Sequence, residues 1–243
     1  MSWKVRKSSD RGHFDHGWLK TYHSFSFSQY WDRNWMGYRA LRVINEDWVA
    51  AGEGFDPHPH DNMEIVTLVL EGALQHQDSM GNGSVIGSGD IQRMSAGTGI
   101  VHSEFNASKT DTVHLYQIWI RPEHEGVSPS YEQKHCSVDK QKNRLLPIVL
   151  PVSEPQRRGV ASEQAVLIHQ DAVVYTSTLD AGIVLTHAPK VPRYYWLQVV
   201  SGSVQVDNVR AQAGDAIFSD APVSETFSIS SENLCQLLLF ELA

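Results

Sequence analysis

The sequence predicts an all-β protein built from two tandem antiparallel β-barrels, with little helix. Three observations support this fold class. Short apolar stretches alternate with polar residues, turn-forming residues separate these stretches at short intervals, and a weak internal repeat links the two halves of the chain. Many short strands with turn signals between them are typical of antiparallel barrels and sandwiches.

The expected strands are marked by a period of two, because successive side chains of an extended backbone point to opposite faces. The clearest examples are residues 23–27, 65–70, 113–120, 195–200, 203–206 and 235–240. Turns rich in Gly, Asn, Asp and Ser are expected at residues 81–83, 87–90, 207–208 and 213–215. These residue types accommodate the backbone conformations of tight turns.

The internal repeat predicts the domain organisation. Residues 68–75, followed by 89–92, resemble residues 198–205, followed by 214–217, and both copies read as strand, Gly turn, strand and then Gly-Asp. The segment Arg121–Arg144 is rich in Pro, Gly, Ser, Glu and Lys and is interpreted as the connection. We therefore expect one domain over residues 1–134 and a second over residues 135–243.

Composition and charge exclude some classes of function. The chain has 243 residues, 41% hydrophobic and 20% charged, with a formal net charge of -8 and no marked Lys/Arg cluster. Proteins that bind nucleic acid usually carry a basic footprint, because phosphate contacts supply much of the affinity. Direct binding of DNA or RNA is therefore not expected, whereas a protein partner stays possible.

A membrane segment is not expected either. The longest apolar run, residues 145–152, contains two prolines and is far shorter than the roughly 20 residues that span a bilayer. Residues 1–12 are polar and charged, without the apolar core of a signal peptide. Cys136 and Cys235 lie too far apart in sequence to suggest a disulfide framework. A reducing cytoplasm is the expected location.

Two pairs of potential metal ligands stand out in the first copy. His58 and His60 are two residues apart, and so are His102 and Glu104. Residues at this spacing on a strand face the same side, so two such strands can direct four donors into one barrel. Imidazole and carboxylate donors suit Fe(II), Mn, Co, Ni, Cu or Zn. Four protein ligands leave two positions open on a six-coordinate metal.

An ordinary interpretation has to be weighed against this metal site. The chain contains 12 histidines, so a His-x-His pair can arise by chance in a surface or core strand. Two features favour ligation: Pro59 stiffens the backbone between the first pair, and the second pair repeats the same spacing.

The glycines around both pairs resemble the two cupin motifs. Gly52 precedes His58 by five intervening residues, and Gly72 closes the first motif. Gly99 precedes His102, and Asn106 follows it at the spacing of the second motif. Gly97 replaces the usual proline, which departs from the pattern.

The acidic position of the first cupin motif departs as well. Ile65 stands where cupins carry a glutamate, and Glu64 is displaced by one residue. A one-residue offset turns a strand side chain to the opposite face. Glu104 is therefore the expected carboxylate ligand, in place of Glu64.

A closer resemblance is to the pirin family. It is carried by residues 11–18, 23–27, 37–43, 58–60, 71–72, 76–81, 94–104 and 115–120. It is dense over residues 10–135 and looser beyond. The resemblance implies a bicupin whose amino-terminal barrel holds Fe2+, or else Zn, Mn, Ni, Co or Cu, on His58, His60, His102 and Glu104.

The sequence of residues 78–82 and 94–100 looks most like that of bacterial pirin-like quercetin 2,3-dioxygenases. This resemblance implies oxidative ring cleavage of a flavonol by O2 with release of carbon monoxide, with Glu104 as the catalytic base. Pirins also include metal-dependent regulators that bind transcription factors. A metal- or redox-responsive regulator that binds a protein partner is therefore the alternative function, and an apolar pocket above the metal would distinguish the enzyme.

The second copy does not repeat the ligands. Alignment on the shared glycines puts Ala188 and Lys190 at the positions of His58 and His60, and Phe227 at that of His102. His169 and His187 are the histidines that follow residue 135. The second barrel is therefore expected to be structural and to lack the metal.

Overall fold

The computed structural model describes residues 2–153 and 164–243. Helix is confined, within this part of the chain, to the short segments η1 (Ser8–Asp10) and α1 (Val138–Gln141). Strands make up most of the rest, and the ladders within each unit are antiparallel. The predicted all-β fold class is confirmed. Over the same residues, no helix has the length and apolar character needed to cross a membrane.

The chain forms two compact units. The first unit contains Arg11–His135 and Val166–Gln170, and the second contains Met1–Asp10, Cys136–Ala165 and Asp171–Ala243. We propose that these units are the two expected domains, 1–134 and 135–243. A single boundary after residue 134 would have placed Met1–Asp10 in the first domain and Val166–Gln170 in the second. In the structure, each of these two short segments belongs to the other unit.

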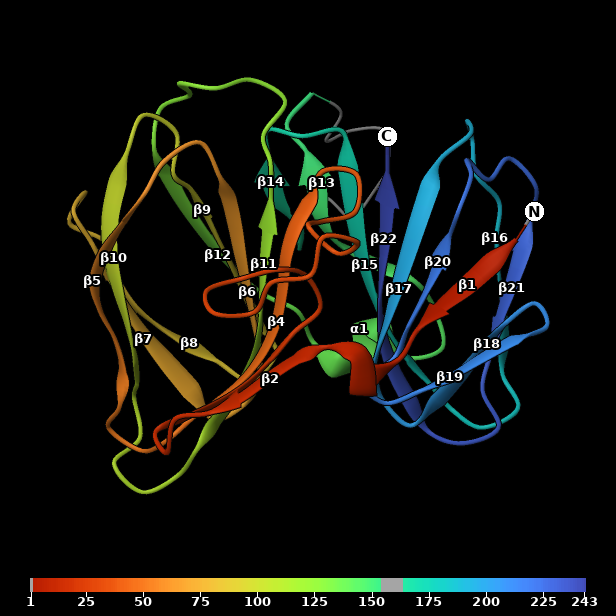
Figure 1. Ribbon diagram of the computed structural model, residues 1–243, viewed down its shortest axis with the longest axis horizontal. Helices are drawn as coiled ribbons and strands as arrows, with labels where there is room; N and C mark the ends of the chain where they lie inside the picture. The colour runs from red at the N-terminus through yellow and green to blue at the C-terminus, as the bar shows by residue number, and fades with distance from the viewer. Residues whose placement is uncertain (1, 154–163) are drawn as a thin grey trace. The chain divides into compact units, whose positions relative to one another are not determined.

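The first unit consists of two antiparallel sheets that face one another (Figure 1). The large sheet has the order β12 (Ser130–His135), β9 (Asp90–Ser95), β6 (Glu64–Glu71), β11 (Val113–Ile120), β4 (Leu41–Val49), β3 (Leu19–His23) and β2 (Gly12–Asp15). The small sheet has the order β5 (Gly54–His60), β10 (Ile100–Asn106), β7 (Ala73–Asp78) and β8 (Gly83–Gly87). The short strand β14 (Val166–Ile168) also belongs to this unit.

The second unit repeats this arrangement. Its large sheet has the order β1 (Trp3–Arg6), β20 (Ala216–Ser219), β17 (Tyr194–Ser201), β22 (Cys235–Leu242), β15 (Ala172–Leu179) and β13 (Leu146–Pro151). Its small sheet has the order β16 (Val184–His187), β21 (Phe227–Ser230), β18 (Ser203–Val206) and β19 (Val209–Gln212).

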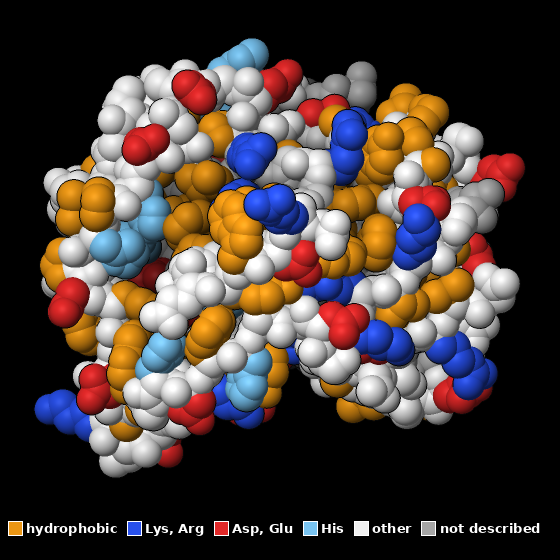
Figure 2. Space-filling view, viewed as in Figure 1, with side chains coloured by type: hydrophobic (Ala, Val, Ile, Leu, Met, Phe, Trp, Pro, Cys, Tyr) orange, Lys and Arg blue, Asp and Glu red, His pale blue; other side chains and the backbone are white. Residues whose placement is uncertain are grey.

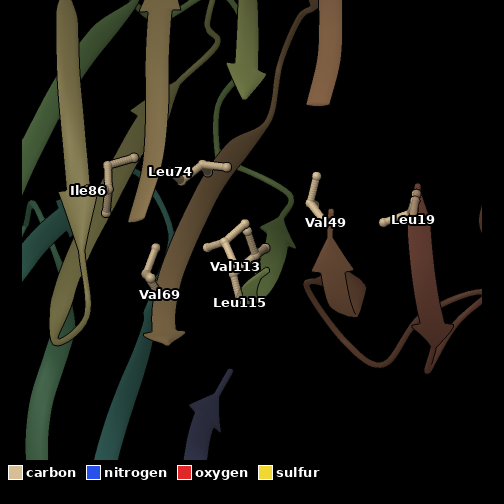
Figure 3. Packing of buried hydrophobic residues seen from close by; sticks show 7 residues of the cluster. All are labelled: Leu19, Val49, Val69, Leu74, Ile86, Val113 and Leu115. Atoms are coloured by element: carbon tan, nitrogen blue, oxygen red, sulfur yellow. The ribbon is translucent and has the colours of Figure 1, made fainter. Parts of the chain in front are cut away.

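Apolar side chains form two separate buried clusters in the first unit. One cluster comprises Leu19, Val49, Val69, Leu74, Ile86, Val113 and Leu115 (Figure 3). A second cluster comprises Ile65, Met94, Ala96 and Ile100. Burial of each large aliphatic side chain contributes about 1.5–3 kcal/mol to the free energy of unfolding. On β10, His102 and Glu104 lie between Ile100 and Asn106, which pairs with Leu74 of the first cluster.

The glycines that define the internal repeat occupy equivalent turns. Gly72 lies between β6 and β7 with φ of 79°, and Gly202 lies between β17 and β18 with φ of 73°. An added Cβ would lie 3.1 Å from the Thr112 carbonyl oxygen at Gly72, and 2.2 Å from the Leu234 carbonyl oxygen at Gly202. Both turns therefore need a left-handed residue without a side chain, which explains the repeated glycine.

The strand register changes one detail of the repeat alignment. His187 of β16 pairs with Phe227 of β21, as His58 of β5 pairs with His102 of β10. His187, not Ala188, therefore stands at the position of His58. The alignment on glycines missed this because the segment from His187 to Gly202 is one residue longer than that from His58 to Gly72.

Candidate metal centre

Strands β5 and β10 bring the predicted ligands together from two distant parts of the sequence. His58 lies directly opposite His102 in the ladder. The register then shifts between His102 and Glu104, so that Glu104 pairs with Phe55. A bulge of this kind re-aims side chains locally. Histidine side chains gather at the surface over these two strands in Figure 2.

The three histidines form a compact triangle. Ring centroids are 4.5 Å apart for His58 and His102, and 4.9 Å apart for His60 and each of the other two rings. One nitrogen from each ring lies within 4.8 Å of the other two, a separation at which all three can bind one ion. Trp119 packs its ring edge-on against His60, with the centroids 4.8 Å apart.

The tautomer of His58 is fixed by its own strand. Its Nδ1 lies 2.7 Å from the Asp56 carbonyl oxygen. A carbonyl oxygen can only accept, so Nδ1 carries the hydrogen and donates it. Nε2 of His58 is left with its lone pair free for a metal.

His102 contacts a chain of polar side chains behind it. Its Nδ1 lies 3.5 Å from Nδ1 of His76, which in turn lies 3.1 Å from Nε2 of Gln92. Nε2 of His76 lies 3.4 Å from Oδ2 of Asp78. Asp78 can accept the His76 Nε2 hydrogen, so Nδ1 of His76 keeps its single lone pair, which faces both the Gln92 amide and Nδ1–H of His102. This order leaves Nε2 of His102 as a lone pair.

That remaining nitrogen supports the fit to a metal. Nε2 of His102 is buried and has no hydrogen-bond partner within residues 2–153 and 164–243. Burial, with the neighbouring His58, lowers the pKa of His60 to about 4 and that of His102 to about 2. Both rings are therefore neutral at pH 7, as metal ligation requires.

Glu104 is held by the opposite sheet. Its Oε2 accepts a 2.7 Å hydrogen bond from Nε2 of Gln117, and its Oε1 a 3.5 Å bond from the Thr67 hydroxyl. Burial, together with the nearby Asp47, raises the pKa of Glu104 to about 7 against the effect of these two hydrogen bonds. A buried carboxylate with a raised pKa is stabilised by a nearby cation, so the donor set fits a divalent metal.

Glu104 groups with His76 and His102 within 4.8 Å, rather than with His58 and His60. His102 belongs to both groups and links the histidine triangle to the carboxylate. All four residues expected to bind the metal thus lie in one region, and their ligation remains a proposal. The sequence did not identify the residues that hold the candidate ligands, which are His76, Gln92, Thr67 and Gln117. The only signal in the sequence is that each of them falls on the inward face of its strand.

A cavity of about 440 Å³ adjoins this region. Its wall includes His58, His60 and Glu104, together with the rings of Phe27, Phe55 and Trp119. Pockets of roughly 300–1,000 Å³ with apolar walls and a few polar groups are typical of small-molecule sites.

Glu64, which the sequence placed near the first motif, and His114 of β11 have different surroundings. Glu64 is fully buried and accepts hydrogen bonds from Ser95 Oγ at 2.7 Å and His169 Nδ1 at 3.0 Å. His114 stacks on Trp48 at 4.1 Å and lies 3.3 Å from Glu46. Neither residue lines the cavity.

In the second unit, the corresponding position is filled by other side chains. Nε2 of His187 lies 3.2 Å from the Tyr195 hydroxyl and 3.2 Å from Oε2 of Glu241. The Phe227 ring packs against His187 with centroids 5.3 Å apart. Trp3 of β1 packs edge-on against Phe227, at 5.0 Å.

Comparison with known proteins relates both units to one family. The family model named Pirin matches residues 4–120, and the model named Quercetinase C-terminal cupin domain matches residues 159–242. The chain is 44% identical over 240 residues to a quercetin 2,3-dioxygenase of Escherichia coli K12, covering 98% of this chain and 97% of that protein. It is 41% identical over 211 residues to a pirin-like protein of Caulobacter vibrioides, covering 86% and 88%.

Solved structures agree in fold. The crystal structure of bacterial pirin YhhW from Escherichia coli in complex with nickel(II) has a TM-score of 0.89 and 41% identity, covering 99% of each chain. A quercetin 2,3-dioxygenase of Acinetobacter baumannii has a TM-score of 0.74 at 21% identity, covering 98% of this chain and 85% of that one, which shows the fold alone. The predicted pair of cupin domains is thereby confirmed.

Proposed function

The chain belongs to the pirin family, and from this premise we propose that it is a metal-dependent dioxygenase that cleaves a flavonol with O2 and releases carbon monoxide. The observation that supports the proposal is the cavity of about 440 Å³ beside His58, His60 and Glu104, whose wall carries the rings of Phe27, Phe55 and Trp119. A regulator that acts only through a surface has no need of such a cavity.

We propose that His58, His60, His102 and Glu104 hold one divalent metal, Fe2+ in the first place, with Zn, Mn, Ni, Co and Cu as alternatives. When bound, the metal would supply Lewis acidity towards the flavonol oxygens and the redox chemistry that a reaction with O2 needs. Nε2 of His58 and Nε2 of His102 supply lone pairs, as fixed by the contacts with Asp56 and His76.

The cavity wall orients the substrate. Phe27, Phe55 and Trp119 offer ring faces and edges to a flat aromatic molecule. Trp119 is itself held by a 3.2 Å hydrogen bond from its Nε1 to Oε1 of Gln117. Gln117 therefore couples the position of the cavity wall to that of Glu104.

Glu104 is the proposed base for the flavonol 3-hydroxyl. Gln117 engages Oε2 at 2.7 Å, whereas the contact to Oε1 is long, so Oε1 is the oxygen that accepts the proton. Burial raises the pKa of Glu104 to about 7 without metal, and a bound cation would keep this group as the carboxylate, the form that can accept a proton. Deprotonation makes the flavonol electron-rich and ready to react with O2.

The test is oxygenation by a defined metal form. Metal content is measured for wild type and His102→Ala, and each metal-loaded protein is then given several flavonols in the presence of O2. We expect loss of flavonol absorbance and stoichiometric carbon monoxide from wild type, and neither from His102→Ala. A fully metallated wild type that turns over none of the flavonols would overturn the proposal.

A reducing cytoplasm is proposed as the location. Cys136 and Cys235 are both free and buried, which matches a protein that does not depend on disulfides. No direct contact with nucleic acid is proposed for a chain with a net charge of -8.

A further inference from the structure

A row of polar side chains crosses the inner face of the large sheet in the first unit. Paired residues on five adjacent strands form it, in the order His23 (β3), Asn45 (β4), Gln117 (β11), Thr67 (β6) and Gln92 (β9). A continuous polar row across the buried face of a sheet is costly unless each group finds a partner.

Three members of the row find partners on the small sheet. Gln92 contacts His76, while Thr67 and Gln117 both hold Glu104. This half of the row supports the candidate metal centre, so its polar character is accounted for.

The other half has no such partner. Oδ1 of Asn45 and Nδ1 of His23 are buried and unpaired throughout the described part of the chain. The adjacent pair on the same two strands, Thr21 and Asp47, contact one another, and the Thr21 hydroxyl and Oδ1 of Asp47 have no other partner within the described residues. These four residues are only 2–4% exposed.

All four residues line the same cavity as His58, His60 and Glu104. A buried acceptor without a partner costs about 1–3 kcal/mol. Oδ1 of Asn45 can only accept, so what satisfies it must carry a hydrogen-bond donor. Burial raises the pKa of Asp47 to about 7, so this carboxyl can accept or donate near neutral pH. A molecule in the cavity can supply such a donor, because all four side chains belong to the cavity wall.

We propose that Thr21, His23, Asn45 and Asp47 form a hydroxyl-recognition subsite, which selects aromatic substrates bearing phenolic hydroxyl groups besides the one directed at the metal ligands. The proposal rests on the proposed function and defines its substrate class. Phe27, Phe55 and Trp119 contact the aromatic rings without discriminating among them, whereas the subsite distinguishes hydroxylated rings from bare ones. Sites built to bind a hydroxyl group discriminate strongly against analogues that lack it, because their polar groups are then left unpaired.

The test compares two flavonols that differ only in the presence or absence of hydroxyl groups on the pendant ring. Binding to the metal-loaded protein is measured by fluorescence titration without O2, so no turnover occurs. We expect wild type to bind the hydroxylated flavonol at least about 10-fold more tightly than the bare one, a factor that corresponds to about 1.4 kcal/mol.

Matched variants then locate the preference. Thr21→Val removes the hydroxyl at constant shape and Asn45→Leu removes the amide, and each should reduce the preference to about 3-fold or less. Thr21→Ser restores a hydroxyl and should keep the preference of wild type. The far-ultraviolet circular dichroism and bound metal of each variant are measured alongside, so that only folded, metallated protein is compared.

The outcomes separate this proposal from the proposed function. Carbon monoxide release with equal binding of both flavonols would overturn the subsite and leave the dioxygenase. A hydroxyl preference that follows Thr21 and Asn45, with no turnover of any flavonol, would support the subsite and overturn the dioxygenase. Failure of both flavonols to bind would overturn both proposals. A Thr21→Val protein that keeps the full preference for the hydroxylated flavonol would overturn the subsite alone.

Discussion

Nδ1 of His102 lies 3.5 Å from Nδ1 of His76, and His76 is completely buried. Asp78 and Gln92 complete the surroundings of His76 and make its Nδ1 an acceptor. His76 thus presents the candidate ligand His102 to a metal in one tautomer. A ligand's second nitrogen is commonly fixed in this way, and loss of the supporting group typically lowers metal affinity 10–100-fold.

Replacement of His76 by leucine should therefore weaken metal binding without removing a proposed ligand. We expect the dissociation constant for Ni2+ or Zn2+ to rise about 10–100-fold, measured by competition with a chelator of known affinity. Asp78→Asn, which keeps an acceptor oxygen, should have a smaller effect.

His135→Gln is the matched control for His76, because His135 is exposed and contacts Asp90, away from the candidate centre. Its metal affinity should stay within twofold of wild type. If His76→Leu binds metal as tightly as His135→Gln does, His76 does not position His102.

Glu104 should make the metal-free protein less stable as the pH rises. Its pKa is raised by burial from 4.5 to about 7, so the folded protein binds a proton that the unfolded chain releases. Its stabilising contribution is complete below pH 4.5 and is lost as the pH rises through about 7. The unfolding temperature of wild type relative to Glu104→Gln should therefore fall by several degrees between pH 4.5 and pH 8.

The comparison with Glu104→Gln isolates this effect from that of His60 and His102, whose lowered pKa values act in the opposite direction. Saturation with metal should abolish the decline for wild type, because the ion stabilises the carboxylate form. A constant difference between the two proteins across this pH range would contradict the raised pKa.

Local spacing was enough to find the candidate ligands. The i, i+2 spacing of His58 and His60, and of His102 and Glu104, indicated strands with shared faces, and the structure brings these side chains into one region. The residues that hold these ligands could not be found this way. Gln117 donates to Glu104 from the other sheet, and this contact depends on how the strands of the two sheets pair and pack.

Long-range pairing also limited the domain prediction. Strand β1, with Trp3, pairs with β20 more than 200 residues away, and nothing in its four-residue sequence indicates this partner. The position of His187 depended in the same way on the length of one loop, which alignment on Gly202 could not reveal. The repeat itself was visible because the glycine turns are sterically required.

Loss of one partner from a buried ion pair should strongly destabilise the first unit. Nη1 of Arg11 donates to Oε2 of Glu46 at 2.8 Å, and both side chains are almost fully buried. Glu46→Gln leaves Arg11 without its counter-charge and should lower the free energy of unfolding by about 3–5 kcal/mol near pH 7, measured with urea.

The pH dependence of this pair has the opposite sign to that of Glu104. Hydrogen bonds from His114 and Arg11 outweigh burial and lower the pKa of Glu46. Its contribution is therefore present above pH 4.5 and is lost as the pH falls through the lowered value. The difference between wild type and Glu46→Gln should shrink in strong acid, and a difference that grows there would contradict this assignment.

The turn glycine of the second unit should tolerate no side chain. At Gly202, an added Cβ would lie 2.2 Å from the Leu234 carbonyl oxygen, a backbone atom that cannot move without displacing the turn before β22. Gly182 is the matched control, because its φ of 79° is similar to the 73° of Gly202 but no atom lies within 4 Å of its added Cβ. Gly182→Ala should cost about 1–2 kcal/mol for the left-handed backbone alone. Gly202→Ala should cost at least about 2 kcal/mol more, because the clash adds to the same backbone cost. Urea unfolding of the two variants separates the contributions, and equal losses would mean that the turn before β22 yields to the added methyl group at little cost.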